Sequence, residues 1–459
     1  MDWSSASDIA TAVSRGQSAL SVVEGALSRI AAHNNALNAF TSVVADRARA
    51  KARAIDGARA AGTPVGSLAG VPFAVKNLFN VKGIATLAGS KINRDLAPAS
   101  RDATLIERLE NAGAVLVGAL NMGEYAYDFT GENVHDGSSR NPHDRNRMTG
   151  GSSGGSGGAV AGGLVPLSLG SDTNGSIRVP ASFCGIFGLK PTYGRLSRAR
   201  TFPFVGSFDH LGPLARSAKD LALAYDAMQG PDDADPVCTT RPKQPVAASL
   251  EQEIDGLRIA VAGGYFRKNL FPEASEAVAK VAAALGATRE VEIPEAERAR
   301  SAAYVITATE GAALHLERLR SRANDFDPAV RDRLIAGTMV PAALVIQAQK
   351  FRRWYRERVL ALFSEVDVIV APATPCTAPA IGQKTFVLDG KEIPLRPNIG
   401  IHTQPISFIG LPVAAVPVPL KPLPIAVQII AAPWREDVVL RVAHALERQG
   451  VTVAPRPGA

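Results

Sequence analysis

Gly150-Gly-Ser-Ser-Gly-Gly-Ser-Gly-Gly158 is the most informative stretch of this chain, and it holds six glycines and three serines in nine residues. A flexible linker has such a composition, but here the apolar run Ala159–Gly170 follows without a break and is typical of a buried helix and strand. A phosphate-binding loop would need a lysine after the glycines, which this stretch lacks. We interpret it as a loop in which glycine permits unusual backbone angles and polar groups converge. Its composition alone leaves a structural and a functional loop equally open.

A second segment rich in small residues, Gly170-Ser-Asp-Thr-Asn-Gly-Ser-Ile-Arg-Val-Pro-Ala181, follows downstream. It places Ser176 after Gly175, at the end of a predicted strand. Small residues before a serine allow backbone N–H groups to point into one space, where a negatively charged oxygen can sit. The pattern therefore fits the geometric need of an oxyanion hole.

The composition of the whole chain is that of a globular protein. Of its 459 residues, 46% are apolar and 20% are charged, which excludes disorder for most of the chain. The 41 glycines and 31 prolines predict many turns, and the 7 histidines make a histidine-based mechanism the less expected kind. Cys184, Cys238 and Cys376 are odd in number and far apart, which predicts a reducing compartment rather than disulfides.

Charge and hydropathy indicate the expected surroundings of the protein. The formal charge of +7 is diffuse, so we expect no nucleic-acid partner and a mild field that favours a small anionic ligand. The N-terminus is acidic and polar and shows no signal peptide, so we expect a cytoplasmic protein. The longest apolar region, Pro405–Pro433, is interrupted by prolines and predicts strands and turns rather than a membrane helix.

Hydrophobic periodicity predicts an α/β fold. The first sixty residues predict two amphipathic helices, the second capped by Ser18, and then an extended segment at residues 37–44. Strand-length apolar runs alternate with helical stretches, which predicts a sheet with helices on its faces. The predicted strands are 71–75, 115–118, 164–170, 257–262, 366–370 and 425–430, and the later helical regions are 104–111, 273–285, 303–363 and 436–448.

Together the two small-residue segments resemble the signature of the amidase signature family, the Ser-cisSer-Lys amidohydrolases. GGSSGG, then GSDTNGSIRVPA, then Phe183-Cys-Gly-Ile-Phe-Gly-Leu-Lys-Pro-Thr192 form the matching motif. The resemblance covers most of the chain and is weakest between about 235 and 365. It continues in Gly70–Asn77, like the family's lysine strand, in Asn121–Glu124, and in Gly410–Pro412 and Pro424–Gln428, like its C-terminal sheet.

This resemblance implies one large twisted mixed β-sheet, covered by helices on both faces, in a single amidase domain spanning 1–459. We expect four segments in that domain. They are N-terminal helices at 1–65, the catalytic signature core at 66–230, a helical embellishment at 231–365, and a C-terminal sheet and helix at 366–459.

Residue by residue, the resemblance implies that Lys76 is the catalytic lysine, Ser152 the serine after a cis peptide bond, and Ser176 the nucleophile. Ser153 adjoins Ser152, but the family's position is the first serine of the pair. A serine hydroxyl needs a base, and without histidine that base is a lysine kept neutral by burial. Lys76 ends an apolar run, as burial requires. A solvated charge is the ordinary alternative for a lysine that ends a strand.

The implied relay runs from Ser176 to Ser152 to Lys76. The backbone N–H groups of Thr173, Asn174, Gly175 and Ser176 would hold the oxyanion. Asp172 and Arg178 are expected to support the loop, with Arg178 facing the substrate as the alternative. We expect no cofactor and no metal, because no third ligand of suitable spacing joins the histidine pairs His135 with His143, or His210 beside Asp209.

Two departures from the family pattern point to a subgroup. Asn174 stands where many members have glycine, so its side chain brings a donor and an acceptor to the oxyanion loop, where we expect it to contact a polar substrate. Thr149 stands where proline often precedes GGSSGG. With Arg147–Ser153 and Ile401-His-Thr-Gln-Pro405, these residues are similar to the 1-carboxybiuret hydrolases of cyanuric acid degradation, part of s-triazine catabolism. That similarity implies release of ammonia from a small, carboxylated, urea-like amide through a serine acyl-enzyme.

Three alternatives stay open at this point. One is the A subunit of a glutamyl-tRNA(Gln) amidotransferase, against which Asn174 and the lack of a basic tRNA-facing cluster count. Another is a different small-amide amidase. The third is a non-catalytic binding member, which the intact Lys76, Ser152 and Ser176 disfavour.

The implied substrate carboxylate calls for a cation. Arg318 and Arg320 are candidates, although a solvated helix face is the more ordinary interpretation of both. His402 is open between a substrate contact and a core histidine bonded to a carbonyl. The resemblance also implies a small helical partner protein, docked on the N-terminal helices and exposed loops, in a homo-oligomer or heterotetramer without a membrane.

Overall fold

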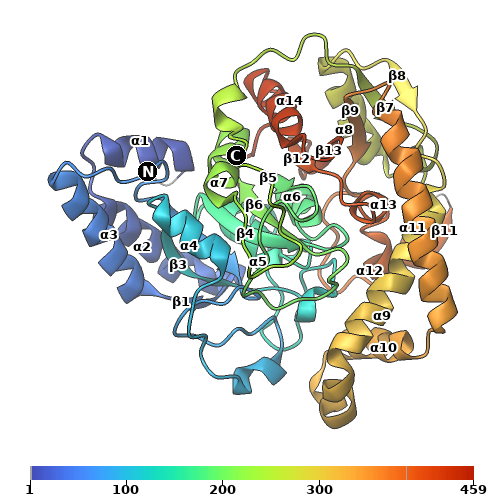
Figure 1. The fold of residues 1–459 in the computed structure, drawn as a ribbon, viewed down its shortest axis with the longest axis horizontal. Coiled ribbons are helices and arrows are strands. Elements are labelled where there is room, and N and C mark those ends of the chain that lie inside the picture. Colours follow the sequence, from blue (N-terminus) through green and yellow to red (C-terminus); the bar gives the residue numbers. More distant parts are fainter. Residues whose placement is uncertain (1–2, 389, 459) are drawn as a thin grey trace.

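An eleven-stranded mixed sheet forms the centre of the molecule (Figure 1). The computed structural model describes residues 3–388 and 390–458, so the ends of the predicted domain, residues 1, 2 and 459, lie outside the described residues. The strand order is β1-β3-β2-β4-β6-β5-β12-β13-β9-β7-β8. The strands are β1 Phe40–Val43, β2 Pro72–Lys76, β3 Val115–Leu120, β4 Leu167–Asp172, β5 Phe187–Lys190, β6 His210–Ala215, β7 Ile259–Ala262, β8 Arg289–Val291, β9 Val368–Pro372, β12 Val413–Val418 and β13 Ile425–Ala431.

Parallel and antiparallel pairs alternate in blocks along this sheet. β2 pairs in parallel with β3 and β4, and β7 with β8 and β9, whereas the strands between these blocks pair antiparallel. The predicted mixed sheet is therefore confirmed. Each of the four predicted segments contributes strands to it, and their boundaries stay a prediction. A separate two-stranded sheet joins β10 Thr385–Leu388 and β11 Lys391–Pro394.

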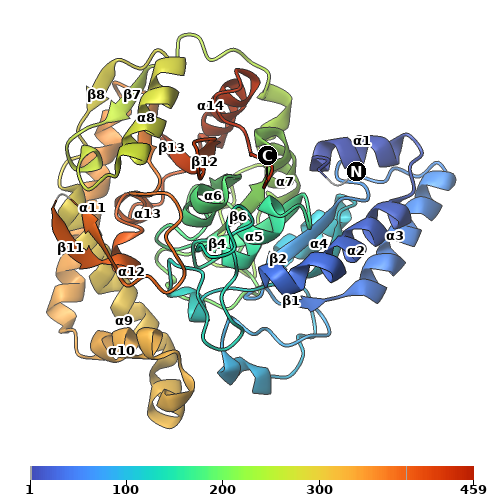
Figure 2. The same cartoon turned by 180° about the vertical axis from the view of Figure 1, so that it is seen from behind.

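Helices flank the sheet, and most of the described buried apolar side chains form one large cluster around it, beside a second, smaller cluster (Figures 1 and 2). The helices are α1 Ala6–Ser14, α2 Ala19–Leu37, α3 Ala45–Ala60, α4 Thr104–Asn111, α5 Gly154–Ala161, α6 Arg178–Cys184, α7 Ala218–Met228, α8 Pro272–Ala284, α9 Ala296–Arg322, α10 Pro328–Thr338, α11 Ala342–Leu362, α12 Leu395–Asn398, α13 Gln404–Ser407 and α14 Glu436–Arg448.

Sequence periodicity predicted some of these helices and missed another. The Ser18 cap of α2 is confirmed, because its Oγ accepts from the N–H of Ser21 at 3.2 Å. The prediction of only two helices in the first sixty residues is wrong, because α3 follows β1 and packs on α2. The sequence of α3 is rich in arginine and alanine, so it shows little apolar periodicity. The single predicted helical region 303–363 is divided among three helices. A proline lies at the start of each later helix, with Pro328 as the first residue of α10 and Pro341 just before α11.

The glycine-rich stretch is only partly the predicted loop. Gly150 has a left-handed φ of 79°, but from Gly154 onward the chain forms the fully buried helix α5. A Cβ on Gly155 would lie 2.5 Å from the carbonyl oxygen of Ala39 and 2.6 Å from the backbone nitrogen of Asn121. The glycines of α5 therefore allow this helix to approach neighbouring backbone closely, rather than permitting unusual angles.

Among the described helices, none alone has the length and apolar character needed to cross a membrane. α10 and α11 meet these criteria only as a pair, and the two are bent by 97° relative to each other.

Candidate active site

Lys76 is the last residue of β2, which lies between β3 and β4 in the sheet. Its side chain is fully buried, and Nζ lies 2.6 Å from Ser152 Oγ and 2.8 Å from Ser171 Oγ, within hydrogen-bond distance of both. Burial lowers the pKa of Lys76 to about 7, against the opposing influence of three nearby aspartates. At neutral pH, a lysine with this pKa is uncharged in a large fraction of the protein molecules. The uncharged amine can accept a proton as a general base.

The two serines of the glycine-rich stretch have different surroundings. Ser152 follows Gly151 through a cis peptide bond, as the resemblance implies, and its hydroxyl contacts Lys76. Ser153 Oγ instead donates to the carbonyl of Ser171 at 3.2 Å and accepts from the Ser171 N–H at 3.3 Å. Ser153 therefore positions the backbone of a strand. Of these two adjacent serines, Ser152 is the one in direct contact with the lysine.

The loop Asp172–Ser176 connects β4 to the start of α6 and carries the predicted nucleophile. Within the described part of the chain, the backbone N–H groups of Thr173, Asn174, Gly175 and Ser176 have no acceptor. Buried N–H groups are nearly always paired, so four unpaired donors in one loop are available to a negatively charged oxygen. The Ser176 hydroxyl forms no hydrogen bond to Ser152 in this structure, although Ser176 is buried in the same region.

Contacts from distant residues hold this loop in place. Thr173 Oγ1 donates to Asp209 Oδ1 at 2.7 Å, and Thr403 Oγ1 donates to the carbonyl of Asn174 at 2.7 Å. Gly175 has a φ of +143°, and a Cβ there would lie 2.2 Å from Thr403 Oγ1. Only glycine fits this position without displacing its neighbour.

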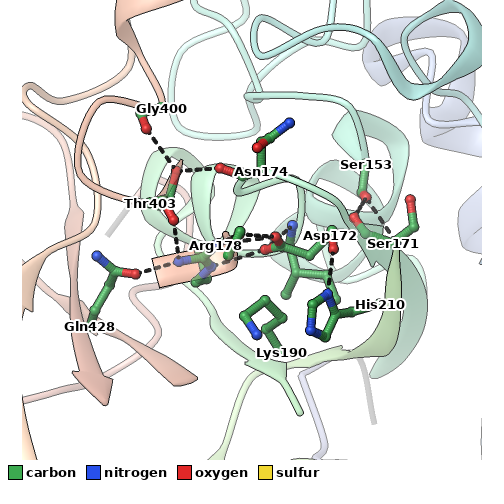
Figure 3. A network of polar contacts seen from close by, with 12 residues as sticks. Ser153, Ser171, Asp172, Asn174, Arg178, Lys190, His210, Gly400, Thr403 and Gln428 are labelled. Atoms are coloured by element: carbon green, nitrogen blue, oxygen red, sulfur yellow. Dashed lines mark hydrogen bonds and ion pairs between the residues drawn. The ribbon is translucent and has the colours of Figure 1, made fainter. Parts of the chain in front are cut away.

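A buried ion pair supports the loop from below (Figure 3). Arg178 forms a bidentate pair with Asp172, with both N···O distances at 3.0 Å, and both side chains are fully buried. Burial would raise the pKa of Asp172, but the Arg178 guanidinium holds that pKa well below its ordinary value. Arg178 also donates to Gln428 Oε1 at 2.6 Å and to Ser407. Its Nε, Nη1 and Nη2 atoms are all engaged in these buried contacts, which fits the structural interpretation of Arg178.

Ser176 lines a narrow cavity of about 20 Å³. Asn174, Tyr304, Thr307 and Arg333 are among its lining residues. A neighbouring cavity of about 230 Å³ reaches Ser171, and the two share Ala126 and Phe204 as lining residues. The narrow cavity holds the predicted nucleophile, so it marks where a scissile bond would lie.

Arg333 was not a candidate from the sequence, yet its guanidinium lines this cavity. It donates from Nε to the carbonyl of Ala329 at 2.7 Å and from Nη2 to the carbonyl of Tyr127, and it lies 3.8 Å from the centroid of the Tyr127 ring. No salt bridge to Arg333 is found in the described part of the chain. Its helix α10 lies far from the signature motifs in sequence, so no local pattern marked it.

The other sequence candidates lie elsewhere. Arg320 is exposed and pairs with Glu317 at 2.8 Å, and Arg318 lies over the Phe202 ring, so neither lines the cavity. His402 is buried, and its Nε2 lies 3.2 Å from the carbonyl oxygen of Lys268, as the core interpretation predicts. Burial lowers the pKa of His402 to about 4. Among the described residues, no group of three or more His, Cys, Asp or Glu is arranged to hold a metal.

The chain is similar to known proteins over most of its length. The model of the amidase family matches residues 21–440. The AtzE subunit of 1-carboxybiuret hydrolase from Pseudomonas sp. (strain ADP) is 56% identical over 437 residues, covering 95% of this chain and 96% of that protein. The A subunit of glutamyl-tRNA(Gln) amidotransferase from Azotobacter vinelandii (strain DJ / ATCC BAA-1303) is 39% identical over 457 residues, covering 93% of each.

One solved structure is similar over nearly the whole chain. It is described as "An unexpected vestigial protein complex reveals the evolutionary origins of an s-triazine catabolic enzyme". It superimposes with a TM-score of 0.97 at 55% identity, covering 98% of this chain and 100% of that one.

Proposed function

Because this chain belongs to the amidase signature family, we propose that it is a hydrolase that releases ammonia from 1-carboxybiuret through an acyl-enzyme on Ser176. The observation that carries the chemistry is the buried contact between Lys76 and Ser152, which supplies a neutral base next to a hydroxyl. The choice of substrate is supported by 56% identity, over almost the full length, with one subunit of a 1-carboxybiuret hydrolase.

In the proposed reaction, Ser176 Oγ attacks the carbonyl carbon of the terminal amide. Its proton passes to Ser152, whose own proton passes to Lys76. The N–H groups of the Asp172–Ser176 loop stabilise the oxyanion of the tetrahedral intermediate. When this intermediate collapses, the C–N bond breaks, and the leaving nitrogen takes a proton from Ser152 and departs as ammonia. Ser152 recovers its proton from Lys76.

Water completes the cycle by the same relay. It loses a proton toward Ser152 and Lys76, attacks the acyl carbon, and releases the product as the proton returns to Ser176 Oγ. Hydrolysis of the terminal amide converts a carboxylated biuret into a urea that carries two carboxylates. The relay consumes only water and needs no redox partner.

We assign the substrate carboxylate to Arg333 rather than to Arg318 or Arg320. Arg333 lines the cavity of Ser176, and its hydrogen bonds go to backbone carbonyls, so its positive charge has no carboxylate partner in the described chain. A guanidinium pairs with a carboxylate in a planar, often bidentate geometry. The protein thereby offers a cation in the lining of the same cavity as the nucleophile.

Replacement of Arg333 tests this assignment. Arg333→Ala is expected to raise KM for 1-carboxybiuret at least tenfold, because a charge-assisted hydrogen bond is worth about 1.5–3 kcal/mol. Turnover of neutral biuret, which lacks the carboxylate, should change much less. Arg320→Ala is the matched control and should leave both unchanged, whereas an unaltered KM in Arg333→Ala would contradict the assignment.

Ammonia release from a panel of amides tests the function as a whole. We expect a higher kcat/KM with freshly prepared 1-carboxybiuret than with biuret or glutamine. Glutamine as the best substrate would favour the amidotransferase alternative, a class in which one relative is 39% identical to the chain. No ammonia from any of these compounds would contradict the proposal.

We also propose that the chain works in the cytoplasm with a small helical partner protein, in a heterotetramer. The similarity to a solved protein complex supports a partner. We expect the partner to dock on α1 and α2, whose apolar faces pack into the core, so the partner would meet their polar faces.

A further inference from the structure

The Asn174 side chain is anchored on one side and unpaired on the other. Its Nδ2 donates to Thr307 Oγ1 at 3.0 Å, whereas its buried Oδ1 has no hydrogen-bond partner in the described part of the chain. The residue is only 7% exposed. A buried amide oxygen without a partner costs free energy, so such an atom in a native site usually pairs with an ordered water or with a bound ligand.

Asn174 and Thr307 both lie at the site of the proposed reaction. Asn174 is two residues before the nucleophile, and Asn174, Thr307 and Ser176 all line the same narrow cavity. Figure 3 shows the Asn174 side chain pointing away from the Asp172–Arg178 pair, so it takes no part in that network. The unpaired oxygen therefore belongs to the substrate side of the loop rather than to its support.

The backbone and the side chain of Asn174 are fixed by different elements. Thr403, just before α13, donates from Oγ1 to the Asn174 carbonyl at 2.7 Å, and Thr307 on α9 accepts from the side-chain amide. Because Nδ2 is held by Thr307, the other end of the amide, Oδ1, is directed away from Thr307. Two anchors on separate elements leave the side chain little freedom to rotate.

We propose that Asn174 Oδ1 accepts a hydrogen bond from an N–H group of the substrate, and that Thr307 is the positioning residue that orients it. The site then selects biuret-type compounds, which carry an N–H between two carbonyls, over diamides of the malonamide type with a CH₂ at that place. This inference rests on the proposed function, because it takes Ser176 to attack an amide in this cavity. A glycine at position 174 would supply no such acceptor.

The chemistry of the selection follows from the unpaired acceptor. A ureido N–H pairs with Oδ1 as the substrate enters, so the buried oxygen becomes satisfied. A CH₂ at the same place leaves that oxygen unpaired and also displaces any water that could have reached it. Sites built to hydrogen-bond a substrate group discriminate strongly against analogues that lack it.

Biuret and malonamide provide the test, because they differ only in the central NH or CH₂. The measurement is kcat/KM for ammonia release, or the inhibition constant against 1-carboxybiuret hydrolysis if turnover of either compound is too slow. In Asn174→Ala and Asn174→Gly, the preference for biuret over malonamide relative to wild type should fall by about tenfold or more. An unchanged ratio in folded variants would overturn the inference.

Thr307 gives a matched pair of variants for the positioning role. Thr307→Val removes the hydroxyl at nearly constant shape and should lower the biuret-to-malonamide ratio in the same direction as Asn174→Ala. Thr307→Ser keeps the hydroxyl and should retain the wild-type ratio. Equal ratios in Thr307→Val and wild type would overturn the positioning role, and circular dichroism of each variant checks that it is folded.

The experiments distinguish a failure of this inference from a failure of the proposed function. A wild-type protein that releases no ammonia from 1-carboxybiuret contradicts the function, whichever ratio the variants show. A wild type that hydrolyses 1-carboxybiuret, with a ratio insensitive to Asn174, contradicts only the role of this side chain.

Discussion

Burial gives Lys76 the lowered pKa that the proposed general base needs. A lysine in water has a pKa near 10.4 and is protonated at neutral pH, so it cannot accept a proton from serine. In this protein burial lowers the pKa of Lys76 to about 7. Its hydrogen-bond partners are the hydroxyls of Ser152 and Ser171. A hydroxyl can exchange a proton with the amine and does not form a permanent ion pair with it. The environment of one residue thus replaces the histidine of other serine hydrolases.

The activity is expected to depend on pH through Lys76. The protonated amine cannot act as a base, so kcat/KM should fall about tenfold per unit as the pH drops below 7 and level off above it. A pH–rate profile of ammonia release, with protein stability checked at each pH, measures this. A flat profile between about pH 5 and 8 would contradict a base with that pKa.

Each member of the proposed relay is expected to be needed. Lys76→Ala, Ser152→Ala and Ser176→Ala should each lower kcat by at least about a thousandfold, because the three groups transfer one proton in series. Ser153→Ala is a matched control from the same stretch, where the hydroxyl contacts only the backbone of Ser171. Substantial turnover by Lys76→Ala or Ser176→Ala in folded protein would refute the assignment.

Arg178 links several elements to the oxyanion loop. From the start of α6 it pairs with Asp172 at the end of β4, and it also bonds to Ser407 on α13 and Gln428 on β13. The C-terminal elements lie more than 200 residues from the loop in the chain, so one guanidinium holds the catalytic loop against the C-terminal strands. A buried ion pair is a poor source of net stability, but it is costly to break.

Removal of this guanidinium should therefore destabilise the fold. Arg178→Met leaves the Asp172 carboxylate buried and unpaired, and we expect the free energy of unfolding to fall by about 3–5 kcal/mol. Urea denaturation followed by circular dichroism measures the change. Arg435→Met, which removes an exposed pair with Asp437, is the control and should cost less than about 1 kcal/mol. A similar small cost for Arg178→Met would contradict this account.

One sheet connects all parts of the chain, from β1 near the N-terminus to β13 near the C-terminus. Lys76 lies at the end of β2 and Ser176 in the loop after β4, whereas Ser152 lies in the glycine-rich stretch just before α5. Helices α9 and α10 close the cavity with Thr307 and Arg333. The region of weakest resemblance thus supplies the residues that we assign to substrate recognition, while the signature supplies the relay.

We expect the activity of the chain to depend on its assembly with the proposed partner protein. Co-expression with its small helical partner should raise the solubility and the specific activity of the chain, and the purified complex should have the mass of a heterotetramer. Light scattering and ammonia assays of the chain with and without the partner test this. A chain that is monodisperse and fully active alone would show that no partner is required.

Much of the fold and the relay was readable in the sequence, because both depend on local patterns. Apolar periodicity predicted α4 and α14 with their observed bounds, and the strand runs lay within a few residues of the observed strands. It missed α3, whose buried face is made mostly of small alanines. The resemblance carried Lys76 and Ser152, and the structure brings their side chains together.

The proposed cation for the substrate lay beyond local pattern, and the sequence candidates Arg318 and Arg320 lie outside the lining of the cavity. Arg333 and Thr307 lie on helices with no motif around them, and an arginine on a helix is usually solvated. Their places at the cavity depend on how α9 and α10 pack against the sheet. Such packing is set by contacts between residues far apart in the chain, which spacing along the chain does not encode.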